Sequence, residues 1–307
     1  MTATTPVQQH RRQLSTVACG LVGVACAVVG LLPWLITGMR LPRIRNSWVT
    51  GPMPEQMPVV LLPFFPSALT LMTAVLVVGG ALAGVTTRIL RARVSRHGFV
   101  AVVLGVLLVQ AGAVLQTAVA LRGGFTDLGP ARLVAVSVAL ILIGVLALVL
   151  IARAPRAGAL IGLGIGALMV AEWMTPPFAR LATSGHEIGL TLVDAVTWLP
   201  PVLIGVAIAW AGVTTVGRVV AAVVTLLGLW LVPALLTAAS TAGSHGSPSA
   251  MLGWTMLHIE ALAEPDTLVP RVLVAVAVAA AGLLVRAVVL PRIRARTSDD
   301  DGAVTRP

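Results

Sequence analysis

The chain has 307 residues, of which 58% are hydrophobic and only 10% are charged. A water-soluble domain of this length needs many more charged side chains to cover its surface. The composition therefore excludes the soluble globular classes and predicts an integral membrane protein. The formal net charge of +10 comes from 21 basic residues that are spread between apolar runs and do not form one patch. This spacing argues against nucleic acid as a partner and is typical of membrane topology signals.

Eight apolar runs of about 20 residues are each long enough to cross a hydrocarbon core of about 30 Å as a helix. We predict an all-α, polytopic transmembrane helix bundle of about eight spans. The transmembrane domain covers 14–290, between a cytoplasmic N-terminal tail (1–13) and a disordered cytoplasmic tail (291–307). The expected spans are 14–36, 67–87, 99–121, 133–152, 158–174, 198–216, 219–239 and 269–290, with outer loops near 37–66, 122–132, 175–197 and 240–268.

The arginines also predict the orientation of the bundle. Summed over alternate sides, they number 14 on the side that holds both termini and 7 on the other. Because cytoplasmic loops carry the excess of basic residues, both termini are predicted to be cytoplasmic. All of the basic residues are arginine, which is typical of a GC-rich bacterial genome, so the expected location is the bacterial cytoplasmic membrane.

The first span leads into a long polar segment, 40–67, in which six prolines prevent a regular helix. Arg40, Arg43 and Arg45 lie there with Trp48 on the predicted outer side. Guanidinium groups bind phosphate well, so these residues are the predicted site for an anion or a lipid headgroup, with membrane lipids as the partner. Pairing with acids of the outer loops is the alternative. The apolar part of the segment, 57–65, is too short to span and is expected at the membrane interface.

The middles of the predicted spans contain no ionisable residue, and their most polar groups are Gln110, Ser137 and Thr225. Proton- or ion-coupled transporters usually place charged groups near the midplane, so this class of protein is disfavoured. Gln110 and Thr117 share one face of the third span. They are expected to hydrogen-bond across helices.

The fifth span carries glycine at every fourth position, at Gly158, Gly162 and Gly166. Such a stripe lets another backbone approach closely, which holds helices together where no hydrophobic force acts between them. These three glycines are therefore predicted to be helix-packing residues. Further along the chain, Pro233 is expected to kink the seventh span.

The outer loops hold most of the acidic and histidine side chains. Together they form a predicted outer-face polar cluster, consisting of Glu55, His186, Glu187, Asp194, His258 and Glu260. His258 and Glu260 point to nearly opposite sides of a helix, which argues against a metal site. The two cysteines lie two helical turns apart in the first span, so neither a disulfide nor a metal site follows from them.

No glycine-rich phosphate loop, nucleophile elbow or paired-cysteine motif is present. No catalytic residue, metal or cofactor is predicted, and an enzyme is disfavoured. The favoured function is a non-enzymatic scaffold or partner subunit with a binding surface on its extracytoplasmic face, working with a membrane-protein partner or as a homo-oligomer. The first alternative is a permease or facilitator of a small or amphiphilic molecule. The second is a membrane-embedded enzyme that acts on a lipid-linked substrate through outer carboxylates.

Overall fold

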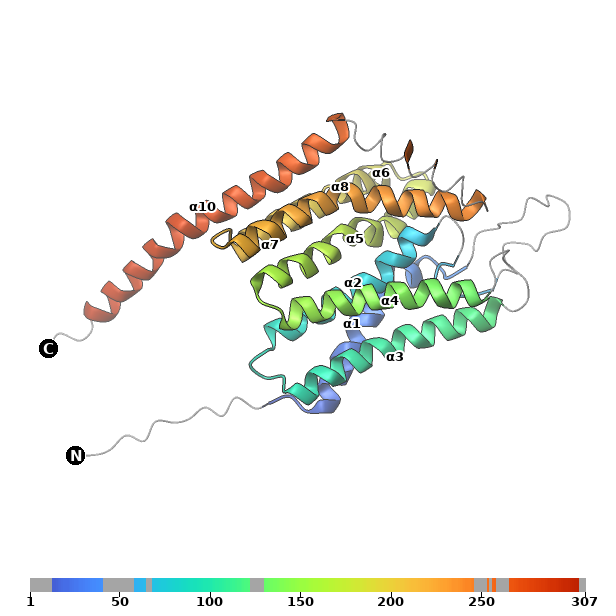
Figure 1. The fold of residues 1–307 in the computed structure, drawn as a ribbon, viewed down its shortest axis with the longest axis horizontal. Helices are drawn as coiled ribbons and strands as arrows, with labels where there is room; N and C mark the ends of the chain where they lie inside the picture. Colours follow the sequence, from blue (N-terminus) through green and yellow to red (C-terminus); the bar gives the residue numbers. More distant parts are fainter. Residues whose placement is uncertain are drawn as a thin grey trace.

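The computed structural model describes residues 13–40, 58–64, 68–121, 130–245, 253, 256–257 and 265–303, most of which lie in long helices (Figure 1). In this part of the chain eight segments are long and apolar enough to cross a membrane. The predicted all-α bundle of eight spans is therefore confirmed. The helices are α1 (Thr16–Ile36), α2 (Leu69–Ile89), α3 (Arg96–Ala120), α4 (Pro130–Arg153), α5 (Arg156–Thr183), α6 (Glu187–Thr197), α7 (Leu199–Ala211), α8 (Val216–His245) and α10 (Pro265–Ala303).

Helices α2 and α5 form the centre of the bundle. α2 packs against α1, α4 and α5, while α5 also contacts α7 and α8. α10 lies at the edge, where it packs mainly along α7 (Figure 1). The buried side chains accordingly fall into two clusters around α1 to α4 and a third around α5, α7 and α8, and α2 contributes to all three.

The start of α1 and the second half of α10 lie at the same end of the bundle (Figure 1). The backbone N–H of Leu14 donates to Arg93, just beyond α2, over 2.9 Å. Arg88 of α2 and Arg286 of α10 both contact Trp210, near the end of α7. We call this the arginine-rich end. That it faces the cytoplasm stays a prediction.

Glycines bring several helix backbones into direct contact. A Cβ atom added to Gly30 of α1 would lie 2.7 Å from the Cα of Gly79 in α2. A Cβ on Gly144 of α4 would lie 3.0 Å from the carbonyl oxygen of Leu76, also in α2. Helices associate in lipid through such close packing. α1 and α4 thus pack against α2 at glycine positions that leave no room for a side chain.

The three glycines of the predicted stripe lie in different surroundings. At Gly162 an added Cβ would come within 2.9 Å of Leu150 Cβ in α4. At Gly166 it would come within 2.7 Å of Ala81 Cβ in α2. Gly158 lies beside the connection between α4 and α5. The stripe thus faces two neighbouring helices in turn, because α5 is central.

The sixth span differs from its predicted form. Residues 175–197, expected to be an outer loop, are mostly helical, because α5 continues to Thr183 and α6 follows it. Pro176 and Pro177 lie inside α5 without ending it, as membrane helices tolerate when neighbours satisfy the freed backbone groups. The 13 residues of α7 rise only about 20 Å, so α6 is needed to complete the crossing.

The apolar segment 58–64, expected at the membrane interface, is packed into the helix bundle, and its depth in the membrane stays a prediction. Val60 and Leu62 are fully buried, and Phe64 is nearly so, against α1, α2 and α3. The backbone N–H of Leu62 donates to Thr117 Oγ1 over 3.1 Å. Polar groups of the helices thus satisfy the backbone of an irregular segment, which lets it enter the bundle. Trp48 and Phe65 lie outside the described residues.

Candidate functional site

A cavity of about 130 Å³ lies at the end of the bundle opposite the arginine-rich end, among α2, α5, α6, α7, α8 and α10. Its walls come from helices that are distant in the sequence. The lining residues are Thr70, Leu168, Met169, Ala171, Glu172, Thr175, Thr197, Pro200, Pro201, Leu229, Pro233, Leu236, Thr237 and Arg271.

Two opposite charges line this cavity. Glu172 lies on α5 and Arg271 on α10. Glu172 lies about 24 Å along α5 from Arg156, a distance shorter than the thickness of the hydrocarbon core. In the described part of the chain neither side chain has an ion-pair or hydrogen-bond partner. Charged groups at membrane depth are costly unless they are paired or bind something, so this pair marks the cavity as a candidate binding site.

Threonine hydroxyls supply the other polar groups of the wall. Thr175 Oγ1 donates to the Ala171 carbonyl over 2.8 Å, and Thr197 Oγ1 donates to the Asp194 carbonyl over 2.7 Å. The hydroxyl of Thr70 lies 3.2 Å from that of Ser240. A hydroxyl that donates to a backbone carbonyl keeps its acceptor lone pairs. The threonines can therefore accept hydrogen bonds from a ligand that carries N–H or O–H groups.

Prolines lie in three of the spans that surround the cavity. A proline has no N–H, so it leaves the carbonyl four residues earlier without its usual donor. Pro176 does this to Glu172, Pro201 to Thr197, and Pro233 to Leu229, and all three affected residues line the cavity. At the cavity, α5, the α6–α7 span and α8 therefore each have a backbone carbonyl that lacks its usual helical donor.

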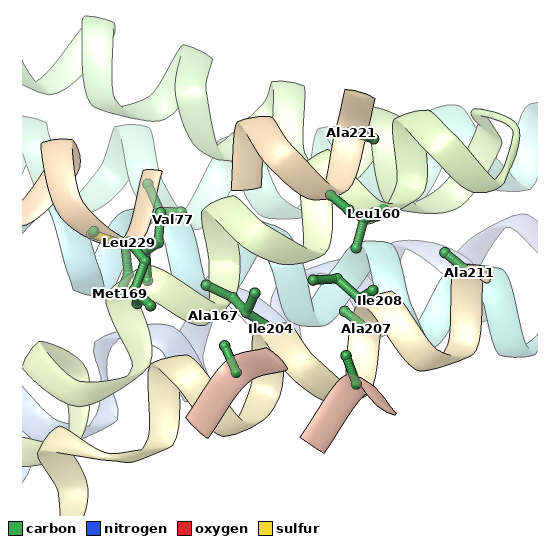
Figure 2. Packing of buried hydrophobic residues seen from close by; sticks show 14 of the residues in the cluster. Val77, Leu160, Ala167, Met169, Ile204, Ala207, Ile208, Ala211, Ala221 and Leu229 are labelled. Atoms are coloured by element: carbon green, nitrogen blue, oxygen red, sulfur yellow. The ribbon is translucent and has the colours of Figure 1, made fainter. Parts of the chain in front are cut away.

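The cavity is closed toward the arginine-rich end by apolar packing. Leu168, Met169 and Leu229 belong both to its wall and to the buried cluster around α5, α7 and α8. Figure 2 shows this cluster continuing through Ile204 and Ile208 of α7. Gln110 is not part of the wall, because its side-chain N–H donates to the Leu76 carbonyl between α3 and α2. The structure thus shows a closed-ended cavity.

The predicted anion site is only partly within the described residues. Arg40 is exposed and forms an isolated antiparallel bridge with Val59. Arg43, Arg45, Trp48 and Glu55 lie outside the described part. The anion or lipid site therefore stays a prediction.

The described members of the predicted outer-face polar cluster do not line the cavity. His186, Glu187 and Asp194 are exposed around the turn between α5 and α6 and along α6. His186 Nδ1 lies 3.3 Å from Ser184 Oγ, and Glu187 occupies the first turn of α6, where a negative charge favours the helix. His258 and Glu260 lie outside the described residues. No group of three metal-ligating side chains is found in the part of the chain that the structure describes.

The two charged residues of the cavity were not among the predicted site residues. Glu172 falls near the end of the fifth predicted span, four residues before Pro176. Arg271 falls near the start of the last span, inside an apolar run. A charge just inside a span, next to a helix-breaking proline, is the signal that points to such sites.

Comparison with known proteins adds no assignment: no protein family, characterised protein or solved structure matches this chain.

Proposed function

We propose that the protein is a non-enzymatic membrane component, a scaffold or partner subunit, that binds a small zwitterionic molecule in the cavity. The observation that carries this proposal is the presence of Glu172 and Arg271 in one wall without a bond between them. A ligand with an ammonium group and an anionic group satisfies both charges at once. Arginine then contributes its forked donors to the anionic group, and the threonine hydroxyls accept from the ammonium group.

An enzyme is less well supported by this geometry. General acid–base chemistry needs two titratable groups that converge on one reacting atom. Among the described lining residues the cavity offers one carboxylate, Glu172, and no histidine. The exposed Glu187 and Asp194 lie on α6 outside the wall.

A permease is the second candidate, and the prolines of the cavity wall favour it. Transporters often bind their substrate beside broken helices, whose irregular backbone lines the site. Pro200, Pro201 and Pro233 all line this cavity. For transport, α7 or α8 must move at these prolines so that the layer formed by Met169 and Leu229 opens.

The proposal is tested by ligand-induced stabilisation of the full chain in nanodiscs. The probes are ω-amino acids of rising length, from glycine to 6-aminohexanoate, with propylamine and propionate as controls that carry one charge. A ligand that binds only the folded state raises the unfolding temperature with its concentration. We expect one chain length to stabilise the protein and neither single-charge control to do so.

Variants locate the binding. Glu172→Gln and Arg271→Gln should each abolish the stabilisation, while Asp194→Asn, which removes an exposed carboxylate outside the cavity, should leave it unchanged. Equal responses to the zwitterions and to propionate would contradict the proposal. Uptake of the best zwitterion into proteoliposomes then separates the two candidates, because only the permease accumulates it inside.

A further inference from the structure

A second concave surface lies at the arginine-rich end, on the side of the bundle formed by α2, α5 and α7. It is an apolar groove of about 400 Å³. Its lining residues are Val85, Arg88, Ile89, Ile151, Leu163, Leu203, Val206, Ala207 and Trp210. Arg88 is the one charged residue among them. The groove is thus lined by apolar side chains and by one cation, Arg88.

Arg88 is held in place at this groove. Its Nη1 donates to the carbonyls of Ile151 and Ala154 at the end of α4, the latter over 3.2 Å. Its guanidinium carbon lies 4.9 Å from the ring centroid of Trp210. In the described part of the chain its Nε and Nη2 have no acceptor. The guanidinium is therefore oriented by protein contacts and keeps donors for a further group.

Two more arginines converge on the same end of α7. Arg286 of α10 donates to the Trp210 carbonyl over 3.1 Å. Arg218 of α8 donates to Thr214 Oγ1 over 2.8 Å, and its guanidinium approaches Gly212 as that of Arg286 does. Among the described residues no carboxylate pairs with any of the three. Three cations near the end of α7, with no carboxylate partner among the described residues, favour an added anion.

The lining of the groove suits part of a lipid, because it combines apolar side chains with one cation. It extends from Arg88 and Trp210, near the last turns of α2 and α7, toward Leu203 and Leu163, deeper along α7 and α5. Basic pockets between transmembrane helices bind anionic headgroups, and Trp is typical of the headgroup level. Val206 is 52% exposed, so the wall is open to an acyl chain.

We propose that this groove binds an anionic phospholipid, with its phosphate on Arg88 and one acyl chain along Leu203 and Val206. The site is separate from the cavity of Glu172, since the buried cluster of Figure 2 lies between them. Lipid binding in the groove does not depend on the proposed ligand of that cavity.

The test uses the full chain in phosphatidylcholine vesicles that contain rising fractions of phosphatidylglycerol with dibrominated acyl chains. Bromine quenches a tryptophan that it touches, and the signal of Trp210 is the difference between the wild-type protein and Trp210→Phe. We expect half-maximal quenching of this signal at a much lower fraction of brominated phosphatidylglycerol than of brominated phosphatidylcholine. Each arginine near anionic lipid is worth about a fivefold change in affinity, so Arg88→Gln should raise the half-maximal fraction about fivefold.

Two variants separate a lipid site from general surface charge. Arg93→Gln removes an exposed charge from the same end, away from the groove, and should leave the quenching unchanged. Val206→Phe fills the groove without changing any charge or the bonds that Arg88 makes to α4, and should raise the half-maximal fraction as Arg88→Gln does.

Four outcomes would overturn the proposal. Equal losses in Arg88→Gln and Arg93→Gln would mean that only diffuse charge attracts the lipid. Equal quenching by the two brominated lipids would mean that the headgroup is not recognised. Relief of quenching by inorganic phosphate at constant ionic strength would assign the arginines to a free anion. A Trp210 signal that no brominated lipid quenches would show that a second copy or another protein covers the groove.

Discussion

The indole N–H of Trp34 in α1 donates to the backbone carbonyl of Val60 over 2.9 Å, and both residues are buried. This bond joins the first span to the irregular segment 58–64. On the other side of the segment, Gln116 in α3 bonds both to the Leu61 N–H and to the Val59 carbonyl, each over 2.9 Å. The segment is therefore a structural part of the bundle, with two of its N–H groups and two of its carbonyls bonded to side chains of the helices.

Thr117→Val should destabilise the protein. The substitution keeps the shape of the side chain but removes the acceptor for the buried Leu62 N–H. An unsatisfied buried donor costs about 1–3 kcal/mol. Thermal unfolding in detergent measures the loss, and Thr191→Val, at an exposed position of α6, is the matched control. An unchanged melting temperature would show that the hydrogen bond between Leu62 and Thr117 does not stabilise the bundle.

Gly162→Leu should weaken the packing of α5 on α4. An added Cβ already lies 2.8 Å from Ile151 Cγ1, so a leucine side chain must push the helices apart. Overpacking of this kind typically costs about 1–3 kcal/mol or more. Gly112→Leu is the control, because an added Cβ at Gly112 has nothing within 4 Å. If both variants melt at the same temperature, Gly162 is not a packing contact.

Glu172→Gln should raise the unfolding temperature while it abolishes zwitterion binding. A carboxylate without a protein partner is more costly to hold at membrane depth than a neutral amide of the same shape. Sites arranged for binding commonly carry such a loss of stability. The measurement is thermal unfolding without ligand, compared with Glu187→Gln at an exposed position. A lower unfolding temperature for Glu172→Gln would indicate that the carboxylate has a structural role instead.

Thr175→Cys should react with a membrane-impermeant thiol reagent added from the outer side. The residue lines the cavity at the end opposite the arginine-rich end. The native Cys19 and Cys26 are replaced by serine so that only the new thiol reports. Thr225→Cys, which is buried between α5 and α8, should stay unlabelled. Labelling of Thr175→Cys only from the inner side would reverse the predicted orientation.

Reporter fusions at the C-terminus should be active only as cytoplasmic reporters, because the arginine asymmetry predicts that both termini are inside. A fusion truncated after Thr183 places the reporter after five spans, so it should be active only as an extracytoplasmic reporter. Activity of the full-length fusion outside the cytoplasm would contradict the orientation.

The interior polar residues illustrate what a pattern predicts and what it leaves open. Gln110 does bond across helices, to the Leu76 carbonyl of α2 over 2.8 Å, as the shared face with Thr117 predicted. Thr117 instead accepts a bond from the loop residue Leu62. Helical periodicity places both groups on one face, but it says nothing about which segment fills the space opposite that face.

The number of spans and the helical class were determined by the sequence alone, because a lipid environment demands about 20 apolar residues in each crossing and leaves the helix as their only form. The sequence did not determine the shape of the sixth span, since Pro176 and Pro177 can end a helix or be tolerated inside one. The candidate site was decided entirely by tertiary structure. Glu172 and Arg271 are 99 positions apart in the chain, and only the packing of α5 with α7, and of α7 with α10, places them in one wall. Periodicity within one helix fixes which residues share its face, whereas the contacts between helices fix which faces meet.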